Sequence, residues 1–126
     1  MQETELIRTT LAALDELKAQ HVTVLDVREL TDITDYMVVA SGRSSRHVSA
    51  VAENVAMRAK QSGFPPLGVE GLTEGEWVLV DLCDAIVHVM QPEARDFYQL
   101  EKLWSGQEEL AARREVSREQ HKAGSV

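Results

Sequence analysis

The stretch WVLVDLCDAIVHVMQPEARDFYQLEKLW, residues 77–104, decides the fold of this chain. It opens with two runs rich in Val and Ile, 77–82 and 85–90, which have the composition of β-strands. Only Cys83 and Asp84 separate the runs, and a two-residue connection is typical of a β-hairpin. The stretch therefore predicts an antiparallel pair of strands.

A helix is predicted after the hairpin, because Pro92 suits a first helical turn and Gly106 lies just past the end at Trp104. Its large apolar side chains spread over more than half of its circumference: Phe97, Tyr98, Leu100, Leu103 and Trp104. A helix packed on a sheet needs a stripe of only ~100°. The excess favours a partner protein, although the N-terminal helix or the charged tail is an alternative cover.

Upstream of residue 77 the sequence predicts two helices and three strands. The expected elements are an amphipathic helix over 5–18, a strand over 21–27, a central strand over 36–41, a helix capped by Ser44 or Ser45 and ended by Gly63, and a short strand around Val69. With the hairpin, they give a single α/β domain whose mixed sheet has about four to five strands flanked by helices.

Composition and charge limit the function. A chain of 126 residues with 44% apolar and 27% charged residues is an ordinary globular protein of one domain. Its single cysteine and the absence of a signal-like N-terminus predict a cytoplasmic protein, and no apolar run reaches the ~20 residues of a membrane span. The net charge of −8 disfavours direct contact with nucleic acid and favours a basic protein partner.

Three residues of the hairpin are candidates for chemistry. Asp81, Asp84 and His88 could meet as a carboxylate and imidazole set suited to acid–base catalysis or a metal. In a strand, however, His88 shares a face with the apolar Ile86 and Met90, which favours a structural histidine. We therefore predict no catalytic residue, no metal site and no cofactor.

Two other features have a functional and an ordinary interpretation. Trp77 opens its strand after a glycine-rich loop, where it either caps the core or anchors a partner. The segment 41–44, Ser-Gly-Arg-Ser, lies between a strand and a helix and could present backbone N–H groups to an anion. It lacks a full phosphate-loop spacing, so turn and cap chemistry explains it as well.

The chain resembles the ribosomal silencing factor family, also called Iojap-like, from about residue 5 to residue 104. The motifs that carry the resemblance, in the family's order, are Asp35-Tyr36, SGRSSRHV at 41–48, GVEG at 68–71, WVLVD at 77–81, Val87-His88-Val89, and Arg95 with Tyr98, Leu100, Glu101, Leu103 and Trp104. The resemblance implies a domain over 1–104 and leaves 105–126 as a charged tail. The family commonly has Gly in the hairpin turn, where this chain has Cys83, and a Cβ resists the positive φ of primed turns.

The resemblance also implies a function. The protein is expected to bind the large ribosomal subunit through ribosomal protein number fourteen, with little direct RNA contact, and to block subunit joining when nutrients are scarce. Motif residues carried over as partner-binding are Trp77, Asp81, Asp84, His88, Arg95, Tyr98 and Trp104.

Two alternatives stay open. The family fold is similar to that of nucleotidyltransferases but lacks the paired acidic strand that holds their metals, so a metal-dependent enzyme using Gly42, Ser44 and Asp81 is one alternative. A homodimer of the free chain is the other, because the excess apolar surface of the last helix could be covered by a second copy.

Overall fold

The computed structural model describes residues 4–98, which form three helices and five strands. In chain order these are α1 (Glu5–Glu16), β1 (Gln20–Asp26), β2 (Tyr36–Ser41), α2 (Ser45–Gln61), β3 (Gly68–Glu70), β4 (Trp77–Asp81), β5 (Ala85–Met90) and α3 (Pro92–Tyr98). Each element predicted from the sequence is present, including the short strand at Val69. Residues beyond Tyr98 of the predicted last helix lie outside the described part of the chain.

The strands form one five-stranded sheet in the order β1-β2-β5-β4-β3. The pair β2–β5 is parallel, and the other three pairs are antiparallel. All six residues of β2 are buried, as expected for a continuously apolar strand that lies inside a sheet. The predicted α/β domain with a mixed sheet is therefore confirmed.

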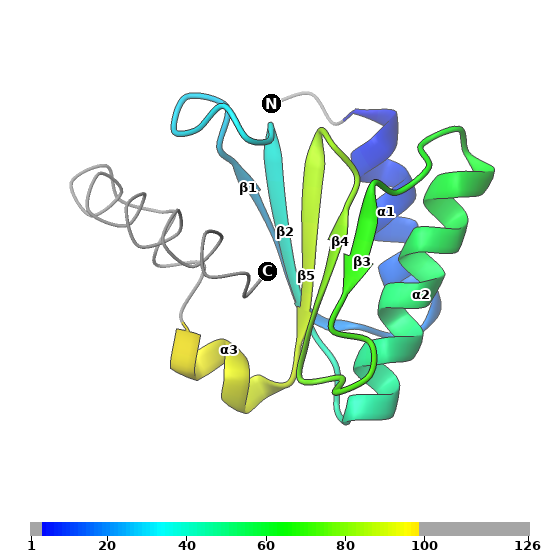
Figure 1. Cartoon of the computed structure of the whole chain (residues 1–126), viewed down its shortest axis with the longest axis vertical. Helices are drawn as coiled ribbons and strands as arrows, with labels where there is room; N and C mark the ends of the chain where they lie inside the picture. The colour runs from blue at the N-terminus through cyan, green and yellow to red at the C-terminus, as the bar shows by residue number, and fades with distance from the viewer. Residues whose placement is uncertain (1–3, 99–126) are drawn as a thin grey trace.

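One face of the sheet is covered by α1 and α2, which lie side by side on it (Figure 1). Ser44 caps α2 by accepting a 3.1 Å hydrogen bond from the N–H of His47. Gly42 lets α2 approach β2, because a Cβ there would lie 2.7 Å from Cγ2 of Val48. Gly63, with φ of +92°, follows the helix in the left-handed conformation expected of a C-terminal stop.

The opposite face, called here the second face, receives α3. Figure 1 shows α3 at the end of the sheet where β2 and β5 finish, away from α1 and α2. Ala94 of α3 is buried with Val39 and Met90 of the second face. Cross-strand pairing and alternation give the residues that β1, β2, β4 and β5 contribute to this face, which are Thr23, Leu25, Met37, Val39, Ser41, Trp77, Leu79, Asp81, Ile86, His88 and Met90.

The hairpin turn between β4 and β5 is tight and strained. Cys83 has φ of +74°, and the N–H of Asp84 donates a 2.9 Å hydrogen bond to the carbonyl of Leu82. A carboxylate oxygen of Asp81 accepts a 2.9 Å hydrogen bond from the N–H of Cys83, which ties down the turn. The hairpin thus forms although its first turn residue has a Cβ. Among the described helices, none has the length and apolar character required to cross a bilayer.

Candidate functional site

Trp77 and His88 form the best-defined polar pair on the second face. Trp77 begins β4 and pairs with Met90, whereas His88 lies in the middle of β5 opposite Leu79. The indole Nε1–H donates a 2.9 Å hydrogen bond to Nδ1 of the imidazole, and the ring centroids lie 5.8 Å apart at 47°. The hairpin register therefore brings two of the predicted site residues into contact.

The hydrogen bond fixes the protonation state of His88. An indole N–H can only donate, so Nδ1 must be unprotonated and the neutral ring carries its proton on Nε2. Only 5% of His88 is exposed, and burial lowers its pKa to about 4. Nε2 is also buried and has no hydrogen-bond partner among residues 4–98, and leaving such a group unsatisfied costs ~1–3 kcal/mol. His88 is thus neutral at physiological pH and incompletely satisfied.

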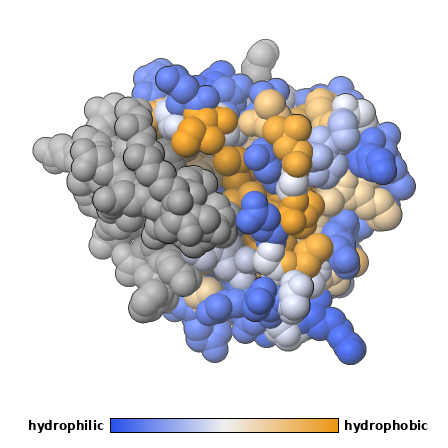
Figure 2. Space-filling model, viewed as in Figure 1, coloured by the Kyte–Doolittle hydropathy of each residue, from blue (hydrophilic) through white to orange (hydrophobic). Residues whose placement is uncertain are grey.

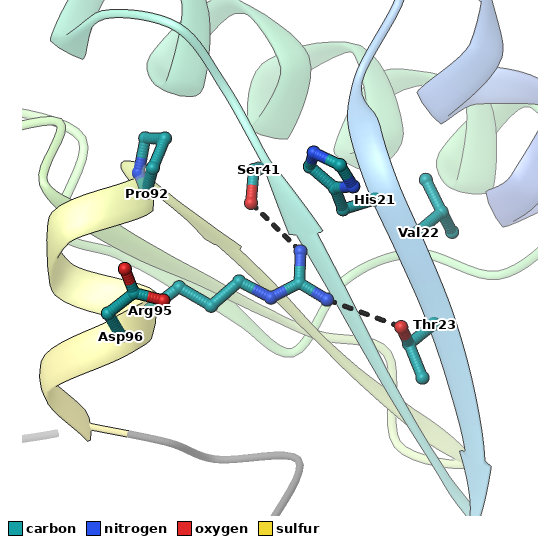
Figure 3. A pocket seen from close by; sticks show the side chains of 7 residues that line it. All are labelled: His21, Val22, Thr23, Ser41, Pro92, Arg95 and Asp96. Atoms are coloured by element: carbon teal, nitrogen blue, oxygen red, sulfur yellow. Dashed lines mark hydrogen bonds between the residues drawn. The ribbon is translucent and has the colours of Figure 1, made fainter.

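Arg95 connects α3 to the sheet at the end of the second face. Its Nη1 donates a 2.8 Å hydrogen bond to the hydroxyl of Ser41, and its Nη2 donates one of 3.2 Å to the hydroxyl of Thr23. Figure 3 shows the guanidinium lying across the two strands between these hydroxyls, in a pocket. The residues that line the pocket are His21, Val22, Thr23, Ser41, Pro92, Arg95 and Asp96. Arg95 therefore sets the position of α3 relative to the sheet.

The acidic site residues lie at the other end of the hairpin. Asp81 pairs with Ile86 near the turn, and Asp84 is exposed in the turn itself. The backbone carbonyl of Asp84 accepts hydrogen bonds from the N–H groups of Asp35 and Tyr36, so this aspartate also fixes the start of β2. The hairpin end of β4 and β5 therefore carries two acidic residues, one at the end of a strand and one in the turn.

The carboxylate and imidazole set considered from the sequence is not assembled among the described residues. Within residues 4–98 no three His, Cys, Asp or Glu side chains gather as a group able to hold a metal ion. Nδ1 of His88 is engaged by Trp77, and Oδ1 of Asp81 accepts from the backbone of the turn.

The residues of the enzyme alternative are also separated. Gly42 follows the end of β2, where Ser41 pairs with Met90 of β5. Asp81 instead pairs with Ile86, four residues back along β5, which is about 13 Å at 3.3 Å per residue. Gly42, Ser44 and Asp81 therefore do not face a common site.

The surface around Trp77 is apolar. Leu79, Ile86 and Trp77 are partly exposed neighbours on β4 and β5. Figure 2 shows apolar surface along the middle of this view, where Figure 1 draws these two strands. An exposed apolar patch next to charged groups is typical of a protein-docking surface.

Two of the predicted aromatic residues are not placed by the structure. Tyr98 is the last residue of α3, and its side chain is outside the described set, as is the whole of Trp104. Sequence reasoning also missed Thr23 and Ser41, the partners of Arg95. They are 72 and 54 residues away from it in the chain, so no local spacing signals the contact.

Comparison with known proteins adds an independent result. A family model described as "Ribosomal silencing factor during starvation" matches residues 1–125. The ribosomal silencing factor of Haemophilus influenzae is 46% identical over 100 residues, covering 79% of this chain and 98% of that protein. That of Chromobacterium violaceum is 42% identical over 107 residues, covering 85% and 88%. The crystal structure of a C. violaceum protein matches with a TM-score of 0.80 and 42% identity, covering 85% of this chain and 89% of that one.

Proposed function

We propose that this chain, which belongs to the ribosomal silencing factor family, docks on the large ribosomal subunit through ribosomal protein number fourteen. Docked there, it blocks joining of the small subunit by steric exclusion and represses translation when nutrients are limiting. The action requires no catalysis and takes place in the cytoplasm, where subunits join. The large subunit is the partner, with little direct contact to its RNA.

The observation that carries the proposal is the Trp77–His88 pair on the second face. Trp is the residue type most enriched among interface anchors, and an anchor works best when its ring is held in place before the partner arrives. Trp77 is partly exposed, and its indole N–H is held by the 2.9 Å hydrogen bond that it donates to Nδ1 of the buried His88. Partly exposed Leu79 and Ile86 extend the apolar area around it.

Charge supports the choice of partner. The chain carries a net charge of −8, which repels RNA phosphates and attracts a basic ribosomal protein. We assign Asp81 and Asp84 as partners for basic groups, because Asp81 lies beside Ile86 at the hairpin end of the second face and Asp84 is exposed in the adjoining turn. Arg95 contributes by holding α3 on the sheet, and Tyr98 and Trp104 are proposed as further aromatic anchors.

Co-sedimentation with purified large subunits tests the docking surface. Trp77→Ala should weaken binding by about 30-fold or more, the size expected of an interface hot spot. Adding Tyr98→Ala should abolish binding at micromolar concentration. Met57→Ala is the matched control, because Met57 is a 48% exposed apolar residue on α2, on the other side of the sheet.

Two results would overturn the proposal. Trp77→Ala could pellet with large subunits as the unsubstituted chain does, or Met57→Ala could weaken binding as much as Trp77→Ala. Measuring the mass in solution of the chain alone, and again after large subunits are added, separates docking from the homodimer alternative. Self-association that disappears on docking means that both use one surface.

A further inference from the structure

We propose that His88 is a positioning residue, which fixes the Trp77 indole in its docking orientation while lowering the stability of the fold. The inference rests on the proposed docking function. It goes further by assigning opposite effects on binding and on stability to one buried side chain.

The environment of His88 favours an aliphatic residue. β5 is the central strand, and its other five residues are Ala, Ile, Val, Val and Met. His88 pairs with Val39 of β2 on one side and with Leu79 of β4 on the other, and only 5% of its surface is exposed. A Leu side chain of similar volume would satisfy these neighbours without removing a polar ring from water.

In this tautomer the imidazole of His88 lowers the stability of the folded state. Because Trp77 donates to Nδ1, the proton of the neutral ring lies on Nε2. That N–H is buried and finds no acceptor in the part of the chain that the structure describes. A buried donor without an acceptor destabilises the folded state more than a single neutral hydrogen bond stabilises it. Packing alone therefore does not explain a histidine at this position.

What His88 provides is an acceptor, Nδ1, within hydrogen-bonding distance of the indole N–H. Trp77 stands at the first residue of β4, packs against the buried cluster of the second face and is only partly buried, so part of its ring remains at the surface. The hydrogen bond, with the rings 5.8 Å apart at 47°, selects one orientation. A preorganised anchor loses less conformational freedom when a partner binds.

Two substitutions separate positioning from structure. His88→Leu removes the acceptor and keeps the volume, whereas His88→Asn keeps an acceptor oxygen where Nδ1 stood. For His88→Leu we expect a melting temperature equal to or above that of the unsubstituted chain, with affinity for purified large subunits weakened about three- to tenfold. For His88→Asn we expect recovery of most of that affinity.

A spectroscopic signature accompanies the binding data. In the free full-length chain, the indole N–H resonance of Trp77 in a ¹H–¹⁵N spectrum should move on His88→Leu and stay near its original position on His88→Asn. Trp104→Phe identifies which of the two indole signals belongs to Trp77. The signal reports the hydrogen bond itself, independently of any partner.

Several outcomes would overturn the inference: unchanged affinity of His88→Leu, an affinity loss that only accompanies a lower melting temperature, or an Asn variant that binds as weakly as the Leu variant. Trp77→Ala in the same assay identifies which claim has failed. If it binds normally, the docking proposal itself is wrong. If it binds weakly while His88→Leu binds normally, docking stands and the positioning role is wrong.

Discussion

Acidification should destabilise this protein, and His88 should account for a defined part of the loss. The perturbation is a decrease from neutral pH to about pH 5, which protonates an ordinary histidine. His88 has a pKa of about 4 in the folded chain, because it is buried, and an ordinary value of 6.5 when unfolded. The unfolded state therefore takes up a proton first as the pH falls, so stability is full above 6.5 and decreases between 6.5 and about 4.

The magnitude follows from the two pKa values. A difference of one pKa unit corresponds to about 1.4 kcal/mol, so protonation of His88 in the unfolded chain lowers the free energy of unfolding by about 2 kcal/mol near pH 5. Near pH 4 the loss reaches about 3 kcal/mol. The free energy of unfolding of a small domain is only ~5–15 kcal/mol, so protonation of this single group removes a large share of the stability.

Urea denaturation over a range of pH values measures the effect, with His88→Leu as the reference. Other groups titrate in both proteins, including Asp26 and Glu16, whose pKa values are lowered by hydrogen bonds from Arg28 and Asn54. The difference between the two pH profiles therefore isolates His88. The reasoning is refuted if the two profiles run parallel from neutral pH down to about pH 4.

Three further predictions are checked by urea denaturation at neutral pH. Gly71 and Gly63 have nearly the same positive φ, +93° and +92°, but only a Cβ at Gly71 would strike an atom, the Trp77 carbonyl oxygen at 2.3 Å. Gly71→Ala should therefore lower the free energy of unfolding by about 3 kcal/mol and Gly63→Ala by only about 1 kcal/mol, and equal losses would contradict this. Cys83→Gly should gain up to about 1 kcal/mol by relieving a φ of +74°, and a loss would mean that the turn is not strained. Ser44→Ala should cost about 1 kcal/mol through the lost cap of α2, and no change would show that another group caps the helix.

Much of the fold was predictable because its signals are local. The apolar run 36–41 predicts a strand buried on both faces, and Ser44 with Gly63 brackets a helix. The parallel pairing of β2 with β5 was not predictable, since it joins segments about fifty residues apart and depends on packing of the whole sheet.

The features of the candidate site also divide into those that local sequence predicts and those that depend on tertiary packing. Sequence alternation placed His88 on an apolar face but did not indicate a bond to Trp77, which requires the register of the hairpin as well as the orientation of two rings. The contacts of Arg95 with Ser41 and Thr23 join three separate elements. No periodicity reports contacts of this kind, because each depends on where the elements finally pack.

Reassociation of purified small and large subunits, followed by light scattering, tests the central claim most directly. The full chain, added in slight excess to large subunits before small subunits, should reduce the fraction of joined ribosomes in proportion to its occupancy. Trp77→Ala should leave joining near the level without the chain, while Met57→Ala should inhibit like the unsubstituted protein. Undiminished joining at a concentration where the chain saturates large subunits would contradict the account.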